Sequence, residues 1–295
     1  MSGTHARVLV GALLAVVAGC WPSQRTAAET DVAVLVGAGD IAGCSDLSGA
    51  EATAKLLDAT PGTVFTAGDN ALPSGTAAQF SDCYAPTWGR HKGRTRPALG
   101  NHDYGTGNAS AYFAYFGAAA GAAGTGYYSY DLDAWHVVVL DSNCQKVGCE
   151  AGSPQERWLR ADLAAHKTAC SLAIWHHPRF SSGLHGDALA TRPLWQALYD
   201  AGGEIVISGH DHDYERFAPQ DADGRLDAER GIRQFVAGTG GRSTRAFGTV
   251  KANSEARATG TFGVLKLTLR PGAYEWRFLP VEGKTFQDSG VGSCH

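Results

Sequence analysis

Residues 204–216, with the sequence EIVISGHDHDYER, place a cluster of ionisable side chains directly after a short apolar run. Residues 205–208 are mostly β-branched, which is typical of a strand that is buried on both faces. Gly209 ends this run and is followed by His210 and His212, whose imidazoles can both turn toward one point. Imidazole is the commonest neutral metal ligand, although an H-x-H motif also fits a polar surface turn. The rest of the chain decides between these two interpretations.

Four other short apolar segments end in the same way, in a glycine or an aromatic residue followed by side chains that can bind metal. Together with GHDH at 209–212, the motifs are GD at 39–40, GDN at 68–70, GNHD at 100–103 and WHH at 175–177. In layered α/β folds, ligands bind at the carboxyl ends of the strands. One polar residue after a strand is common by chance, whereas five such motifs in one chain indicate a shared site.

The side chains in these motifs favour a transition metal. They offer two carboxylates, one amide and at least three imidazoles, a mixed oxygen and nitrogen set that suits Zn, Mn or Fe better than Ca. This set is too large for a single four-coordinate ion. A centre with two ions roughly 3.5–4 Å apart accommodates it, and such centres hydrolyse phosphate esters.

This ordered series of motifs, from Asp40 to Arg216, resembles the calcineurin-like metallophosphoesterase superfamily. The segment GHDHDYER is similar to the purple acid phosphatase branch and its secreted bacterial relatives. The resemblance implies an α/β fold of the metallo-dependent phosphatase type, which is a four-layer α/β/β/α sandwich with two mixed β-sheets. We expect one such domain over residues 32–295.

The resemblance also implies a role for each ligand. Asp69 is expected to bridge two metal ions, Asp40 and His212 to bind the first ion, and the remaining ligands to bind the second. The six expected ligands are Asp40, Asp69, Asn101, His176, His210 and His212. The expected cofactors are two divalent or trivalent transition metal ions, drawn from Zn, Mn and Fe.

Four further residues are implied to act on the substrate. His102 is the expected catalytic histidine, which protonates the leaving oxygen or stabilises charge on the phosphoryl group, and Asp103 is expected to orient its imidazole. A metal-bound hydroxide would attack phosphorus in line. His177 is expected to contact substrate, with the alternative that it replaces His176 as a ligand. His185 is expected either to reach substrate or to lie in a solvent-facing loop.

Two positions differ from the family pattern. The purple enzymes carry a tyrosine three residues after the bridging aspartate, where this chain has Leu72. Other branches carry a histidine two residues after the first aspartate, where this chain has Ala42. We therefore expect no Fe(III)–tyrosinate, and one protein ligand fewer at the first metal.

The expected function is hydrolysis of small phosphate esters, with monoesters preferred. Two alternatives stay open: a phosphodiesterase that uses the same site, and a surface protein that binds metal or phosphate through a weakened first metal site. A serine hydrolase is excluded because no G-x-S-x-G motif occurs. The net charge of −4 argues against nucleic acid as a partner, and no particular oligomeric state is predicted.

The N-terminal residues are typical of an export signal. After a short basic start, residues 8–18 form an apolar run that is too short to span a bilayer. The sequence VAGC at 17–20 resembles a bacterial lipobox, so we expect a signal peptide over 1–20, a lipid anchor at Cys20 and a tether over 21–31. Ordinary signal-peptide cleavage near Ala27 or Ala28, which would discard Cys20, is the alternative. The expected location is extracytoplasmic, either secreted or anchored at the surface of a bacterium.

The cysteine count agrees with export. Removing Cys20 from the seven cysteines leaves six, an even number that can form three disulfides in an oxidising compartment. Cys144 and Cys149 are expected to form one of them, because a four-residue spacer closes easily. No C-x-x-C spacing occurs, which argues against a metal site built from cysteines.

Overall fold

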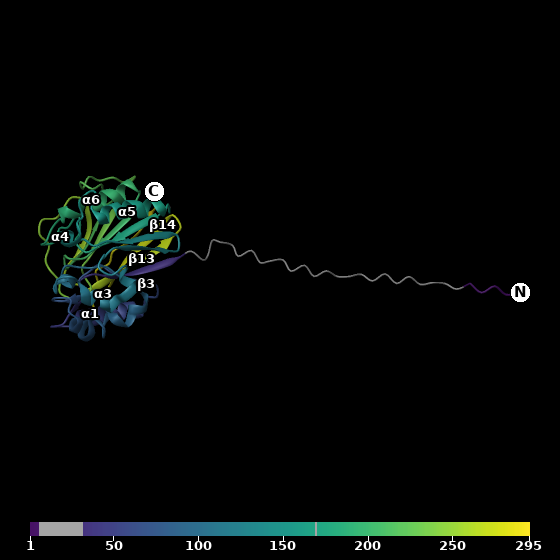
Figure 1. Ribbon diagram of the computed structural model, residues 1–295, viewed down its shortest axis with the longest axis horizontal. Helices are drawn as coiled ribbons and strands as arrows, with labels where there is room; N and C mark the ends of the chain where they lie inside the picture. Colours follow the sequence, from purple (N-terminus) through teal and green to yellow (C-terminus); the bar gives the residue numbers. More distant parts are fainter. Residues whose placement is uncertain (6–31, 169) are drawn as a thin grey trace. The chain divides into compact units, whose positions relative to one another are not determined.

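The computed structural model describes residues 1–5, 32–168 and 170–295, and one folded unit covers Asp31–His295. Two β-sheets face each other within this unit, and helices cover their outer faces (Figure 1). The predicted α/β fold with two mixed sheets is confirmed. Cys20, the tether over 21–31 and most of the predicted signal peptide lie outside the described residues. None of the described helices has the length and the apolar character that crossing a membrane requires.

The first sheet is mixed and contains six strands. In order across the sheet they are β15 Ser289–Ser293, β14 Ala273–Pro280, β13 Gly263–Arg270, β1 Ala33–Ala38, β3 Thr63–Thr66 and β5 Thr95–Pro97. Strands β1, β3 and β5 run parallel, and the other three continue the sheet in antiparallel fashion. Strand β5 lies at the edge of the sheet. Proline has no backbone N–H to donate, and at an edge Pro97 is tolerated because no further strand needs that hydrogen bond.

The second sheet has seven strands and is also mixed. In order they are β12 Ser254–Ala258, β10 Tyr214–Phe217, β11 Arg233–Ala237, β9 Ile205–Ser208, β8 Cys170–Ile174, β7 Trp135–Val139 and β6 Tyr128–Leu132. The four strands β11, β9, β8 and β7 are parallel. A separate two-stranded parallel ribbon pairs β2 Ala42–Gly43 with β4 Ala71–Leu72.

Buried apolar side chains fill the spaces between four layers. Because successive strand residues point to opposite faces, Val137 and Val139 pack between the two sheets, whereas Val138 packs under the helices. Figure 1 shows α1 and α3 on one side of the sheets and α5 and α6 on the other. The helices are α1 Ser48–Asp58, α2 Ala77–Gln79, α3 Ser110–Phe116, α4 Cys144–Val147, α5 Pro154–Ala165 and α6 Arg192–Asp200. This is the predicted four-layer sandwich.

Three disulfides join six cysteines of the folded unit, in the pairs Cys44–Cys83, Cys144–Cys149 and Cys170–Cys294. The predicted pairing of Cys144 with Cys149 is confirmed. Disulfides persist in oxidising compartments and are rare in the cytosol, so these bonds indicate an extracytoplasmic protein.

Removing the Cys170–Cys294 disulfide is expected to lower the free energy of unfolding by about 3 kcal/mol. The two cysteines are 124 residues apart, and their bond ties the chain after β15 to the start of β8 in the other sheet. Urea unfolding of the paired Cys170→Ser and Cys294→Ser variant measures this loss. The matched control removes Cys144 and Cys149, which are only 5 residues apart, and should cost less. Equal losses in the two variants would contradict this account.

Candidate metal centre

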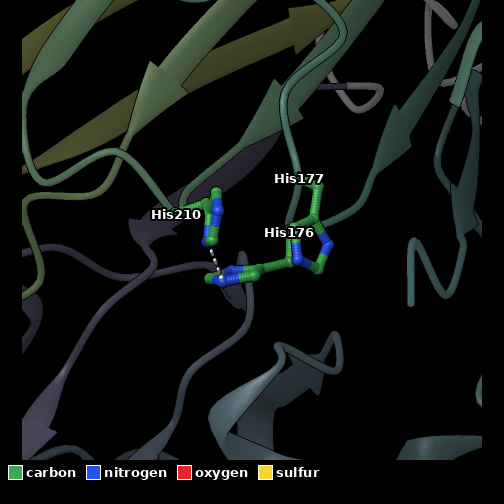
Figure 2. Close-up of side chains that lie close together, drawn as sticks. All are labelled: His176, His177 and His210. Carbon is green, nitrogen blue, oxygen red and sulfur yellow. Dashed lines mark hydrogen bonds between the residues drawn. The ribbon is translucent and has the colours of Figure 1, made fainter. Parts of the chain in front are cut away.

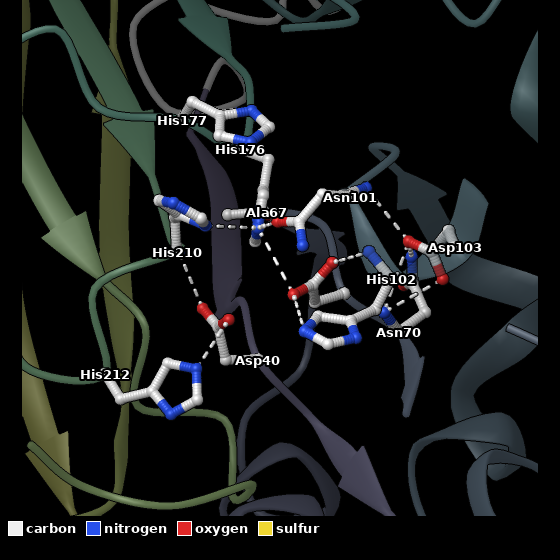
Figure 3. A network of polar contacts seen from close by, with 12 residues as sticks. Asp40, Ala67, Asn70, Asn101, His102, Asp103, His176, His177, His210 and His212 are labelled. Atoms are coloured by element: carbon white, nitrogen blue, oxygen red, sulfur yellow. Dashed lines mark hydrogen bonds and ion pairs between the residues drawn. The ribbon is translucent and has the colours of Figure 1, made fainter. Parts of the chain in front are cut away.

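The five motifs predicted from the sequence all follow strands at their carboxyl ends, and their side chains meet in one place (Figure 3). Asp40, Asp69 and Asn101 follow β1, β3 and β5 of the first sheet. His176 and His210 follow β8 and β9 of the second sheet. Each sheet therefore supplies part of one site, which is why residues so far apart in sequence converge.

Three of these residues have left-handed backbone conformations. The φ angles are +59° at Asp40, +53° at Asp69 and +71° at His210. Such angles are uncommon outside glycine and carry strain, which in proteins concentrates at functional sites. Backbone hydrogen bonds hold the turn, because the Asp40 N–H donates to the Gly68 carbonyl at 3.0 Å. The strained turns direct these side chains off the strand axis and into the centre.

Glycines in the motifs let the backbone approach the buried carboxylates. A Cβ atom at Gly209 would lie 2.7 Å from Asp40 Oδ2, and one at Gly100 would lie 2.1 Å from Asp69 Oδ1. Neither position has room for a side chain, because each Cβ would also meet backbone atoms, the Asp69 nitrogen at 2.2 Å for Gly100 and the Ala67 carbonyl oxygen at 2.9 Å for Gly209. The glycine that precedes the ligand in these motifs is therefore part of the site.

One group of ligand atoms surrounds His176 Nε2. Asn101 Oδ1 lies 3.0 Å from this nitrogen and Asp69 Oδ2 lies 3.3 Å from it. His210 Nδ1 lies 3.2 Å away (Figure 2). Two atoms that each lie about 2.1 Å from a shared ion, at an angle of about 90–110°, are about 3.0–3.4 Å apart. All three separations fit ligands of one cation.

A second group lies on the other side of the centre. His212 Nε2 is 3.2 Å from Asp40 Oδ1, the same spacing as in the first group. Asp40 is fully buried, and its Oδ1 has no hydrogen-bond partner among the described residues. A buried carboxylate oxygen without a donor is costly unless a cation compensates it. The residues present therefore fit a metal ion at this position as well.

The electrostatics of the site also call for positive charge. Burial lowers the pKa of His176, but the carboxylates of Asp69 and Asp40 outweigh burial and raise this pKa to about 10. Burial and the neighbouring His176 lower the pKa of His210 well below its usual range. The buried carboxylates thus need a cation beside them, either a proton on His176 or a metal ion. Metal binding at this position releases the proton.

The His102 side chain lies at the edge of the centre and is 39% exposed. Its Nδ1 is 2.6 Å from the Pro73 carbonyl oxygen, and a carbonyl only accepts, so Nδ1 carries a hydrogen. Nε2 then faces the centre, 3.8 Å from Asp69 Oδ2. The His102 backbone N–H also donates to Asp69 Oδ1 at 2.8 Å, which ties the histidine to this carboxylate.

The prediction that Asp103 orients the His102 ring is wrong. The Asp103 carboxylate accepts hydrogen bonds from the Asn70 amide and the Gly100 N–H, each at 2.9 Å, and not from the His102 ring (Figure 3). Burial and the charge of Asp69 raise the pKa of Asp103 to about 7. Asp103 therefore joins the loops after β3 and β5, and the backbone of Pro73 orients the histidine instead.

His177 and His185 both lie against His210. The His177 ring centroid is 4.4 Å from that of His210, and the His185 ring stacks on His210 at 4.2 Å. Ser142 accepts the His177 backbone N–H at 2.8 Å, and its hydroxyl lies 2.8 Å from His177 Nδ1. His185 also contacts the guanidinium of Arg245. Burial and the nearby His176 lower the pKa of His177 to about 3, so its imidazole is neutral.

Several residues of the site were not predicted from the sequence. Ser142 follows β7, in a motif DSN at 141–143 that has the same strand-end position as the five that were recognised. Ser243 lies in the loop after β11, and its hydroxyl is 2.6 Å from His212 Nδ1. The Arg245 N–H donates to the His212 carbonyl at 3.0 Å. A search for polar side chains directly after every apolar strand would have found Ser142. No local sequence pattern marks Ser243 or Arg245.

The two departures from the family pattern lie together beside the centre. Gly43 pairs with Leu72 in the ribbon of β2 and β4, and Ala42 pairs with Ala71. Ala42 and Leu72 are buried and offer no atom that can bind metal. Of the ligands predicted for the first ion, Asp40 and His212 are in place, and Asp69 has a ligand atom within 4.8 Å of one on Asp40.

The sequence profile of the calcineurin-like phosphoesterases matches residues 24–214 of this chain. The chain belongs to this family. Among its relatives, purple acid phosphatase 21 of Arabidopsis thaliana is 35% identical over 99 residues, which are 32% of this chain and 22% of the plant protein. An uncharacterised protein of Mycobacterium tuberculosis is 29% identical over 186 residues, which are 50% of this chain and 35% of that protein. The matches thus span about a fifth to a third of these relatives.

Two solved structures share the fold. A purple acid phosphatase from yellow lupin seeds superposes with a TM-score of 0.73 at 19% identity, over 89% of this chain and 54% of the lupin chain. GAP50, described as the anchor in the inner membrane complex of Plasmodium, gives a TM-score of 0.68 at 15% identity, over 90% of this chain and 89% of that chain. At these identities the likeness concerns the fold alone.

Proposed function

We propose that this phosphoesterase hydrolyses phosphate monoesters outside the cytoplasm, with two transition metal ions bound at the site just described. The observation that carries the proposal is the spacing of the ligand atoms in two groups, with ligand atoms of Asp40, Asp69 and His176 all within 4.8 Å of one another. The second ion would be bound by Asn101, His176 and His210. The first ion would be bound by Asp40 and His212. When bound, two such cations polarise the phosphoryl oxygens and lower the pKa of water, so that a nucleophile forms near neutral pH.

His102 would transfer the proton to the leaving oxygen. The Pro73 carbonyl holds the hydrogen on Nδ1 and leaves Nε2 at the exposed edge of the centre, where an ester oxygen can reach it. General acid catalysis contributes most when the leaving group is a poor one. Asp103 supports this step indirectly, because it fixes the loop that carries His102.

The phosphoryl oxygens would contact the side chains around His210. His177 is a neutral donor whose Nδ1 is held by Ser142, and His185 lies between His210 and Arg245. The guanidinium of Arg245 suits the second negative charge on the phosphate of a monoester, a charge that the phosphate of a diester lacks. Together with the likeness to purple acid phosphatases, this favours monoesters over the alternative, a phosphodiesterase at the same site.

Zn, Mn or Fe suits the mixed oxygen and nitrogen ligands. Leu72 supplies no phenolate, so we propose that the protein lacks an Fe(III)–tyrosinate.

For localisation, the three disulfides support export, and secretion or a lipid anchor at Cys20 is part of the proposal. Cys20→Ala should release an anchored protein from the membrane fraction.

Replacing His102 by alanine is expected to lower kcat about a hundredfold on an alkyl phosphate, and clearly less on 4-nitrophenyl phosphate. The nitrophenolate leaves without help, whereas an alkoxide needs the proton from Nε2. The measurement uses protein reconstituted with Zn, Mn or Fe and assayed on aryl and alkyl monoesters and on a matched diester.

His91→Ala is the matched control, because His91 is a partly buried histidine that contacts Asp58 and Arg94 away from the centre. If wild type and His102→Ala are equally inert while metal still binds, the enzyme proposal falls. The protein would then be a metal- or phosphate-binding protein with a weakened first site. Faster hydrolysis of the diester than of the monoesters would favour the phosphodiesterase.

A further inference from the structure

A pocket of about 420 Å³ opens beside the proposed metal centre. Asn101 and His177 form its inner end, and Tyr104, Asn143 and Lys146 form one wall. Since Asn101 and His177 also belong to the centre, the pocket opens directly beside the place proposed above for the phosphoryl group.

A second pocket of about 560 Å³ adjoins the first. Tyr104 and Lys146 line both pockets, and the second continues past Phe113 to Gly124. No carboxylate occurs among the described residues that line either pocket. This is notable in a chain with a net charge of −4, and it leaves Lys146 as the charged group on the shared wall.

The wall that carries Lys146 is held in place from two directions. The Tyr104 hydroxyl donates to Asp141 Oδ2 at 2.6 Å, and the Asn143 amide donates to Asp141 Oδ1 at 2.8 Å. The Cys144–Cys149 disulfide closes the segment around α4, and the Lys146 N–H donates to the Asn143 carbonyl at 2.7 Å. Lys146 therefore projects from a fixed backbone, although its side chain is exposed.

The Lys146 ammonium lies 6.0 Å from the centre of the Tyr104 ring and makes no ion pair with a carboxylate of the described residues. An unpaired ammonium beside an aromatic ring, at a pocket without carboxylates, suits an anionic group on a carbon skeleton. The metal centre at the inner end already accounts for the phosphoryl group. The group at Lys146 would be a second anion on the same substrate.

We propose that the substrates of this site are phosphate esters whose alcohol part carries a second anionic group, a carboxylate or a further phosphate, which binds Lys146. This inference rests on the phosphoesterase function proposed above. Lys146 would determine specificity, and would not take part in the chemical step.

The test compares aryl phosphates that carry a carboxylate on zero, one or two methylene groups with the corresponding neutral carboxamides. Wild type should prefer at least one carboxylate over its carboxamide about fivefold in kcat/KM, as one exposed ion pair allows. Lys146→Gln should abolish this preference and leave the kcat/KM for the carboxamides unchanged. Lys146→Glu should reverse it, so that an aminomethyl counterpart becomes the better substrate.

Lys92→Gln is the matched control, because the Lys92 ammonium lies 4.5 Å from the centre of the Tyr115 ring and lines neither pocket. This variant should keep the wild-type preference. If wild type hydrolyses the carboxamides but prefers no carboxylate, the inference is overturned while the phosphoesterase proposal stands. An equal loss of preference in both lysine variants would also overturn it. If wild type hydrolyses none of the esters, both proposals fall.

Discussion

Replacing Asp69 by asparagine is expected to lower kcat/KM on aryl phosphates by about 10⁴-fold and to reduce the bound metal below two ions per chain. Asp69 has a ligand atom within 4.8 Å of ligand atoms on both Asp40 and His176, so it lies between the two groups. Its Oδ2 lies 3.3 Å from His176 Nε2, and its Oδ1 accepts the His102 N–H at 2.8 Å. An amide in its place removes the negative charge that would lie between the two proposed cations, so both the metal content and the position of His102 should change.

The measurement combines metal analysis after dialysis with steady-state kinetics. Asp58→Asn is the matched control, because Asp58 forms an exposed ion pair with Arg90 at 2.8 Å and lies outside the centre. It should keep two ions and the wild-type rate. Retention of two tightly bound ions and of activity in Asp69→Asn would show that Asp69 is not the bridge.

The position of the metal centre can be predicted from the sequence because each ligand motif is recognisable from its own few residues. A short apolar strand that ends in glycine and then in a ligand is visible without any partner strand, and the structure places all five such motifs together. A sixth instance, Asp141–Asn143 after β7, is not among the motifs on which the prediction rests. Ser142, whose hydroxyl lies 2.8 Å from His177 Nδ1, and Asp141, which holds the pocket wall that carries Lys146, are therefore missing from the prediction.

Side-chain orientation was less predictable, because it depends on contacts between distant segments. Asp103 follows His102 in sequence, and proximity suggested that it orients the ring. The ring is instead bound by the Pro73 carbonyl, 29 residues earlier, while Asp103 satisfies the Asn70 and Gly100 donors. No pattern within the GNHD motif distinguishes these two arrangements.

Strand β15 is hard to predict from its own sequence, for a different reason. Its sequence SGVGS has low strand propensity, since glycine has no side chain to pack. In the structure a Cβ at Gly290 would lie 2.3 Å from the Trp276 ring, and one at Gly292 would lie 2.2 Å from the Tyr274 ring. The two rings of β14 cover the glycines across the sheet, so packing from the neighbouring strand overrides the local preference.

Replacing His212 by alanine is expected to remove the first metal ion and to lower kcat/KM by about 10³-fold, while the second ion stays bound. His212 Nε2 is 3.2 Å from Asp40 Oδ1, and Ala42 and Leu72 supply no replacement ligand. The first ion would keep only two carboxylates, whereas the second would keep Asn101 and two imidazoles. Loss of one histidine should therefore lower the metal affinity of the first site more than that of the second.

Ser243→Ala provides a graded comparison for His212→Ala. The Ser243 hydroxyl lies 2.6 Å from His212 Nδ1, so its loss leaves the ligand in place but frees its orientation. Removing such an outer partner costs about 10–100-fold in metal affinity, less than the loss of the ligand itself. Titration of the metal-free protein should give two ions for Ser243→Ala, with one bound more weakly, and one ion for His212→Ala. Two ions of unchanged affinity in His212→Ala would mean that the first site is built from other residues, and the assignment of His210 and His212 to different ions would fall with it.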